Sequence, residues 1–201
     1  MPARHPGARD AAMKILVDRL KDSPTDFAFR ETEAWRAEAE EMIPELRGPL
    51  AAPIEAKLRA YRMSEDIYLE GRLAGAIELQ CGRCLVRYRA PLSEPFRLVL
   101  SPAGSRVPVE PEAAQSLARF GMCLGDELET GWFQGYEIDF GGFFREIVTL
   151  AIPVQPLCSE QCKGLCPRCG ADRNADPCEC GEQRPKTAFT ALEALRTRGE
   201  S

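Results

Sequence analysis

The sequence has little of what most hydrolases use for acid–base chemistry, because its 201 residues contain one histidine. That residue, His5, lies in a Pro-, Arg- and Gly-rich stretch that we expect to be a flexible extension over residues 1–12. Imidazole is the usual general base near neutral pH and a common metal ligand. We therefore do not expect a Ser-His-Asp or Cys-His hydrolase, and any metal site must use other ligands.

Long apolar runs are also missing. None approaches the roughly 18 residues of a spanning helix, and the first residues lack the apolar region of a secretory signal. We expect a protein of the cytoplasm, with no membrane partner and no small-molecule substrate. Positive charge is not in excess either, since 26 Lys and Arg oppose 31 Asp and Glu, a net charge of -5. Counterion release alone cannot then drive nucleic-acid binding, so any RNA contact must come from a local patch.

What the sequence does contain is the composition of a soluble globular protein, with 44% hydrophobic and 28% charged residues. Alternating apolar and polar residues over 54–60 and 67–80 predict two long strands. Shorter strands are predicted at 14–20, 27–30, 85–89 and 96–100. Several strands joined by turns favour an antiparallel β-meander, open or curled into a partly closed barrel.

Two helices interrupt this pattern. Apolar residues at helical spacing predict a surface helix over 32–43, and a second helix begins after Asp139 and ends before Pro153. Its wetter face is expected to carry Arg145, Glu146 and Thr149. Residues 101–136, rich in proline and without a sustained period, are expected to be a long loop or insertion with at most a short helix near 113–120. The fold class is α+β, with a small C-terminal Cys-rich zinc module.

The expected domain organisation follows from these patterns. After the extension, a sheet domain with helices spans residues 13–157, and a zinc-binding knuckle spans 158–184. A short helix over 187–195 lies in the C-terminal segment 185–201, and its apolar residues would pack back on the sheet.

Nine cysteines carry most of the chemical information. In a chain without an export signal, a reducing compartment favours metal ligation over disulfides. Six thiols fall within 23 residues that offer almost no apolar side chains, and a metal would supply the missing stabilisation. Structural zinc is the favoured interpretation, with a reduced flexible tail or an iron–sulfur cluster as alternatives. The six are Cys158, Cys162, Cys166, Cys169, Cys178 and Cys180.

A separate pair, Cys81 and Cys84, has the Cys-Gly-x-Cys spacing of thiol–disulfide enzymes. Those enzymes place the first thiol at a helix N-terminus, whereas the residues after Cys84 are predicted as strand and turn. A metal knuckle between two strands is the better interpretation. Counting then pairs it with Cys158 and Cys162 and leaves Cys123 over. The remaining four thiols, Cys166, Cys169, Cys178 and Cys180, form a complete second site, so one or two Zn²⁺ ions are expected. Alternatively, the six C-terminal thiols hold one ion with two spares.

Arginines accumulate near this knuckle. Arg87 and Arg89 share one face of an alternating strand, with Arg83 just before them. They are either an ordinary solvated strand face or a small basic surface that contacts RNA phosphates or a protein partner.

Taken together, these motifs resemble a known family. They are Glu78–Cys84 as Glu-Leu-Gln-Cys-Gly-Arg-Cys, the helix from Ile138 to Val154, Pro156-Leu157-Cys158, Cys162–Gly170, Asn174, and Cys178-Glu179-Cys180. In combination and order they resemble the YceD family of bacterial proteins needed for large-subunit ribosomal RNA accumulation, over residues 13–195.

The resemblance implies a non-enzymatic ribosome-biogenesis factor that supports synthesis, processing or accumulation of the large-subunit (23S) rRNA. Its partners would be large-subunit rRNA or ribosome-assembly proteins. Two alternatives stand beside it. One is a zinc-containing protein–protein adaptor unrelated to rRNA. The other is a zinc-dependent or Cys-x-x-Cys redox enzyme, which lacks support because four-thiolate sites leave no open coordination position.

Overall fold

The computed structural model describes residues 13–47, 50–104, 110–125, 129–175 and 178–180. The predicted extension 1–12, residues 181–184, and the segment 185–201 with its predicted helix lie outside the described residues. The chain divides into two compact units. The first comprises residues 1–80 and 87–156, and the second comprises residues 81–86 and 157–201. Residues 81–86 group with the cysteine-rich segment in this division.

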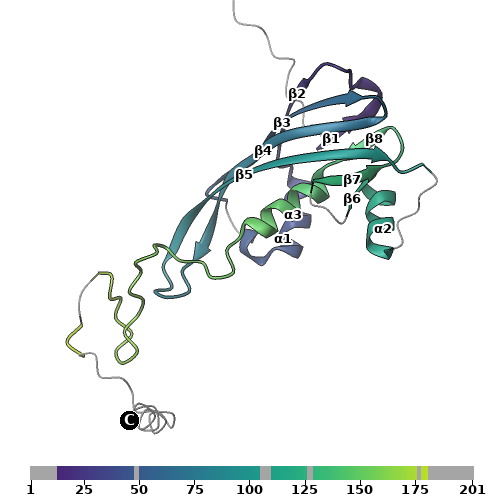
Figure 1. Cartoon of the computed structure of the whole chain (residues 1–201). Coiled ribbons are helices and arrows are strands. Elements are labelled where there is room, and N and C mark those ends of the chain that lie inside the picture. The colour runs from purple at the N-terminus through teal and green to yellow at the C-terminus, as the bar shows by residue number, and fades with distance from the viewer. Residues whose placement is uncertain (1–12, 48–49, 105–109, 126–128, 176–177, 181–201) are drawn as a thin grey trace, which may run out of the picture. The chain divides into compact units, whose positions relative to one another are not determined.

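A six-stranded sheet forms the centre of the first unit, in the order β2-β3-β4-β5-β7-β6 (Figure 1). Its strands are β2 (Thr25–Arg30), β3 (Ala52–Met63), β4 (Asp66–Gln80), β5 (Arg87–Pro102), β6 (Met122–Leu124) and β7 (Thr130–Phe133). Neighbours are antiparallel except β5 and β7, which are parallel. A two-stranded sheet pairs β1 (Lys14–Leu16) with β8 (Glu137–Asp139). The predicted α+β class is confirmed, and the larger sheet is open, with β2 and β6 as its outer strands.

The helices are α1 (Glu33–Met42), α2 (Pro111–Phe120) and α3 (Gly141–Ala151). The Thr32 side chain caps α1 by accepting a hydrogen bond from the Trp35 N–H, 3.2 Å away. At the start of α3, Asp139 Oδ1 accepts from the Gly141 N–H at 2.8 Å. Short 3-10 turns span Val17–Arg19 and Pro44–Leu46. The first of these ends β1 early, so the predicted strand over 14–20 is half strand and half turn.

One continuous strand, β5, replaces the two strands predicted at 85–89 and 96–100. Pro91 and Pro95 lie within it, opposite Ala76 and Arg72 of β4. β5 pairs with β7 only from Val99 onward. The prolines therefore occupy a stretch with one free side, where a missing N–H removes no ladder bond.

Residues 101–136 also differ from the expected loop. They contain α2, β6 and β7, with only the short helix foreseen from the sequence. β6 and β7 have three and four residues, too few for an alternating pattern to register. Leu117 of α2 packs with Cys123 and Trp132 in a small second core.

The main core lies between the sheet and helices α1 and α3 (Figure 1). Phe140 and Phe144 are almost fully buried, and Phe144 contacts the rings of Phe29 and Phe96. Gly71 of β4 lies beneath the Phe96 ring, where a Cβ would collide with Leu58. Close approach of the strands here therefore requires glycine.

Arg145 was expected on the solvent-exposed face of α3, but its side chain is buried. It forms an ion pair with Glu38 of α1 at 3.1 Å, and its guanidinium lies over the Phe120 ring. Burial lowers the pKa of Arg145, while Glu38 opposes that shift. Helix–helix packing, which the sequence period does not report, thus turns one polar residue inward.

Candidate metal centres

The first metal centre begins as a tight loop between β4 and β5. The Leu85 N–H donates to the Cys81 carbonyl and the Cys81 N–H donates to the Val86 carbonyl, both at 2.9 Å. Leu85 adopts the left-handed backbone conformation, with a φ of 61°. The Arg83 N–H points at Cys81 Sγ, 3.4 Å away. These bonds turn both thiols of the pair, Cys81 and Cys84, toward one side of the loop.

The other half of this centre comes from residues 158–165. The Cys162 N–H donates to the Ser159 carbonyl at 3.0 Å, and the Leu165 N–H donates to the Arg83 carbonyl at 3.0 Å. Gly164, with a φ of 71°, lets the two loops approach, because a Cβ there would lie 3.0 Å from that carbonyl oxygen. The two loops are therefore held together by backbone contacts as well as by sulfur.

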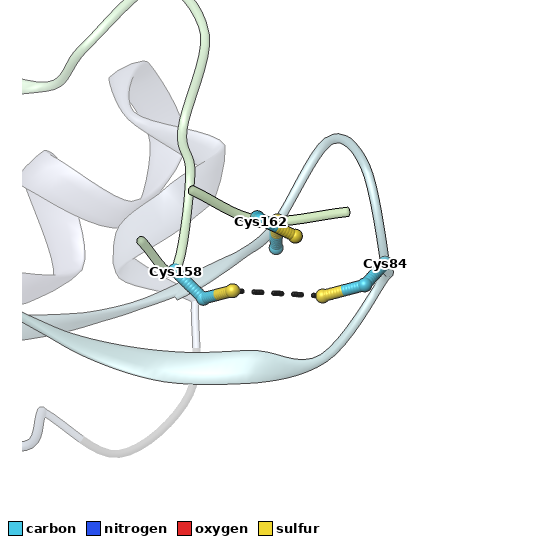
Figure 2. Close-up of side chains that lie close together, drawn as sticks. Cys84, Cys158 and Cys162 are labelled. Carbon is cyan, nitrogen blue, oxygen red and sulfur yellow. Dashed lines mark hydrogen bonds between the residues drawn. The ribbon is translucent and has the colours of Figure 1, made fainter. Parts of the chain in front are cut away.

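Four sulfurs meet where these loops join. Cys84 and Cys158 face each other with their Sγ atoms 3.6 Å apart (Figure 2). Cys81 and Cys162 Sγ are 3.8 Å apart, and all four sulfurs lie within 4.8 Å of one another. The set Cys81, Cys84, Cys158 and Cys162 is called the first tetrad below.

The donor set fits a tetrahedral metal ion. Four sulfurs at the usual Zn–S bond length of about 2.3 Å stand about 3.8 Å apart, close to the two separations given above. All four are free thiols, so no disulfide competes for them. Closed sites of four thiolates are typical of structural zinc and leave no position for substrate.

The second tetrad consists of Cys166, Cys169, Cys178 and Cys180, whose sulfurs also lie within 4.8 Å of one another. Its loop closes through the Cys166 N–H, which donates to the Ala171 carbonyl at 2.8 Å, and the Gly170 N–H, which donates to the Cys166 carbonyl at 2.9 Å. Gly170 has a φ of 73°. Cys169 is exposed, whereas three thiols of the first tetrad are buried.

One thiol in each tetrad is poised to ionise. Burial opposes ionisation of Cys81, but N–H groups of Cys158, Cys84 and Arg83 outweigh it and lower its pKa to about 6. The N–H groups of Cys169 and Arg168 lower the pKa of Cys166 to about 6. Burial raises the pKa of Cys158 to about 12. Each set therefore offers a first thiolate to a cation, and a bound cation would displace the remaining protons.

The ninth thiol, Cys123, belongs to neither tetrad. It is buried in the small core beside α2, and burial raises its pKa. The division into two sets of four and one remaining thiol is the one that counting gave. The one-ion alternative with two spare C-terminal thiols does not describe this arrangement of sulfurs.

Asn174, one of the motif residues named in the sequence analysis, contacts the first tetrad. Its Nδ2 donates to Cys162 Sγ at 3.4 Å, while its Oδ1 accepts from the Lys163 N–H at 2.8 Å. Asn174 follows the first cysteines of the second tetrad in sequence, so it ties the two tetrads together within the second unit. Spacing of cysteines alone carries no signal for such an outer hydrogen bond.

The three predicted partner-binding arginines lie in different settings. Arg83 Nη1 donates to the Cys162 carbonyl at 3.0 Å, so this side chain also fastens the first tetrad. Arg87 pairs with Glu78 at 3.0 Å on an exposed surface and lines a hollow of about 340 Å³ with Arg47 and Glu45. Arg89 is exposed and stands opposite Glu78 in the sheet.

Among the described residues, no helix combines the length and apolar character needed to cross a membrane.

Comparison with known proteins gives curated relatives but no match among solved structures. The chain is 25% identical over 167 residues, 74% of its length, to an Arabidopsis thaliana protein named large ribosomal RNA subunit accumulation protein YCED homolog 1, chloroplastic. It is 29% identical over 136 residues, 66% of its length, to an uncharacterized protein of Mycobacterium tuberculosis. It spans 50% of the first relative and 57% of the second, about half the length of each.

A family profile also matches the part of the chain that contains the site. The profile described as large ribosomal RNA subunit accumulation protein YceD matches residues 69–196, which include most of β4, all of β5 and α3, and both tetrads. This match extends over more than half of the chain. The chain therefore belongs to the YceD family.

Proposed function

We propose that this protein is a non-enzymatic ribosome-biogenesis factor that supports synthesis, processing or accumulation of the large-subunit (23S) rRNA in the cytoplasm. The family match carries this proposal, since the family is described by large ribosomal RNA subunit accumulation. The same words name the Arabidopsis relative. The chemistry of the tetrads agrees with it, because closed thiolate sites stabilise a fold and leave no position at which substrate could bind.

In this proposal both tetrads hold structural Zn²⁺, two ions per chain. Zinc would bind the four sulfurs of each tetrad and take the place of an apolar core, because the buried side chains among the described residues of the second unit are all cysteines. The N–H bonds to Cys81 and the Asn174 amide on Cys162 would orient and stabilise the thiolates. No chemical step is assigned to the metal.

The partners in this proposal are large-subunit rRNA or ribosome-assembly proteins, contacted in part by Arg83, Arg87 and Arg89. Arg87 and Arg89 stand on the exposed side of β5 and are available to a partner. Arg83 is also bonded within the second unit, so its substitution is expected to loosen the first tetrad as well.

Depletion of the protein in its own cells tests the function directly. We expect large-subunit rRNA to fall relative to small-subunit rRNA, and a wild-type copy to restore it. Affinity purification with RNA sequencing and mass spectrometry should recover large-subunit precursors or assembly proteins. An unchanged ratio of the two rRNAs after depletion would refute the proposal and favour an adaptor unrelated to rRNA.

A further inference from the structure

The face of the sheet that points away from the main core is charged, and its charge differs from that of the chain. Alternate residues of β2, β3, β4 and β5 point to this face, which we call the outer face. It carries two more cations than acids, although the whole chain has a net charge of -5. The cations are Arg30, Lys57, Arg59, Arg72, Arg87, Arg89 and Arg97, and the acids are Asp26, Glu55, Asp66, Glu70 and Glu78.

In one row of residues across this face, the charged side chains are all cations. Lys57 of β3 stands directly opposite Arg72 of β4, and the row continues to Ala28 and Pro95 on the flanking strands. Like charges at directly opposed positions destabilise a sheet. Arg72 Nη1 donates to Ser93 Oγ at 2.8 Å, and no described residue forms an ion pair with Lys57. The row is thus arranged to attract an anion.

The adjacent row alternates in sign. Asp26, Arg59, Glu70 and Arg97 follow one another across the four strands. Arg59 is paired with Asp26 at 3.2 Å, whereas no described residue pairs with Arg97 at ion-pair distance. Arg97 therefore adds a third available cation beside Lys57 and Arg72.

An aromatic pair completes the face. Tyr61 of β3 and Tyr68 of β4 stand opposite each other, one row beyond Arg59 and Glu70. Their rings are stacked with centroids 5.2 Å apart and an interplanar angle of 10°, and both side chains are half exposed. Partly exposed rings near cations form an arrangement with which proteins bind unpaired bases and their phosphates.

The outer face also carries several small residues and is not covered by the described helices. Small residues stand among the charged side chains of this face, namely Ala28, Ala74, Pro91, Ser93 and Pro95. Helices α1 and α3 cover the opposite face (Figure 1), and α2 packs on β6 and β7. The helices in the described residues thus leave the outer face of β2–β5 uncovered.

Resting on the proposed function, we propose that the outer face of β2–β5 binds a single-stranded segment of RNA. Lys57, Arg72 and Arg97 would contact phosphates, and Tyr61 and Tyr68 would stack on unpaired bases. A single strand fits better than a duplex, because the bases of a duplex are stacked on each other and hidden from the two rings. A protein partner would need carboxylates for the cation row but gains nothing specific from the tyrosine pair, so RNA is the occupant that uses both features.

Binding of fluorescent polyuridine of about 20 nucleotides to the purified full chain tests this proposal. The variant Lys57→Gln/Arg72→Gln should bind about tenfold more weakly at low salt, and its slope of log affinity against log salt should shrink by about 1.4. The matched control Arg19→Gln/Lys21→Gln removes the same two charges at exposed positions outside these strands and should bind as wild type. Thermal melting and metal content check that all variants are folded.

The aromatic part is tested in the same assay. Tyr61→Ala/Tyr68→Ala should lose about fivefold or more in affinity for each ring removed. Tyr61→Phe/Tyr68→Phe keeps both rings and should restore binding, which a requirement for the hydroxyl groups would not allow. An RNA duplex of equal length should bind more weakly than the single strand.

Three outcomes would overturn the proposal. They are equal binding by the cation-row variant and its control, absence of binding by the wild type, and capture of assembly proteins that depends on Lys57 and Arg72 when RNA has been digested. None of these outcomes refutes the proposed function if depletion still lowers large-subunit rRNA. Normal rRNA after depletion would instead refute the proposed function, whatever the outer face binds in solution.

Discussion

The two units of this protein contain different kinds of interior. In the first, aromatic and aliphatic side chains such as Phe140, Phe144 and Ile138 are almost completely buried. In the second, among the residues that the structure describes, every buried side chain belongs to a cysteine, namely Cys81, Cys84, Cys162 and Cys166. Apolar burial stabilises a fold by about 25 cal/mol per Å², so it requires many buried side chains. A metal ion bound by four thiolates can stabilise a small module with few other buried side chains.

The stability of the two units should therefore depend on different conditions. The first should respond to changes in side-chain volume and to denaturant, as hydrophobic cores do. The second should respond to chelators and to substitution of single sulfurs.

Metal removal should separate the two units most strongly. Protein purified without chelator is expected to carry about two zinc ions, and structural zinc in small modules is worth about 10–16 kcal/mol of apparent binding free energy. A strong chelator should therefore unfold residues 157–180 and leave the sheet folded. Elemental analysis and limited proteolysis with mapped fragments measure both effects. Less than about half a zinc ion per chain would show that the tetrads are not zinc sites.

Loss of one sulfur should act on one unit only. Cys166→Ser is expected to lose about one zinc ion per chain and to expose residues 166–180 to protease, because three thiolates hold the ion more weakly. Cys123→Ala, which removes the thiol outside the tetrads, is the matched control and should keep full zinc content. If both variants retain the same zinc, the second tetrad is not a metal centre.

A cavity in the apolar core should give the opposite pattern. Phe144→Ala is expected to destabilise the first unit by about 3–5 kcal/mol, because the side chain is fully buried among aromatic rings. Zinc content should not change. Urea unfolding followed by the fluorescence of Trp35 and Trp132 measures the loss, and a parallel loss of zinc would show that the units do not respond independently.

The smallest effect on folding is expected from the arginines. Changing Arg83, Arg87 and Arg89 to Ala should shift the melting temperature of the first unit by only a few degrees, since the exposed ion pair of Arg87 contributes under about 1 kcal/mol and the bond of Arg83 lies within the second unit. Association with rRNA or its precursors should fall and be sensitive to salt if phosphates are the target. Arg87→Ala/Arg89→Ala, which spares the bond from Arg83 to the first tetrad, separates partner binding from loop stability. Normal association of both variants would exclude this surface.

The sequence was most informative where chemistry is strict. Cysteine count and spacing indicated two sets of four, and the sulfurs lie in those sets. The alternation over 54–60 and 67–80 is present in β3 and β4. Both signals are local and repeat, so no knowledge of distant partners was needed to recognise them.

Sequence patterns failed where a distant partner decides. Pro91 and Pro95 are tolerated in β5 because no strand pairs with its free side at those positions, which only the strand order reveals. Arg145 is buried because Glu38, on another helix, meets it. The outer face was missed for a related reason, since Lys57 and Arg72 belong to different strands and become neighbours only through the sheet register.

The position of the first tetrad in the chain has a consequence for how the protein is made. Its two halves are encoded far apart, since Cys158 follows Cys84 by 74 positions. At ordinary rates of protein synthesis, the ribosome needs roughly 4 to 15 s to cover that distance. During this interval Cys81 and Cys84 exist as a half-site, able to take up a stray metal or to be oxidised. β5, α2 and α3 are synthesised in the meantime, so the hydrophobic unit can form before its neighbour has all its ligands.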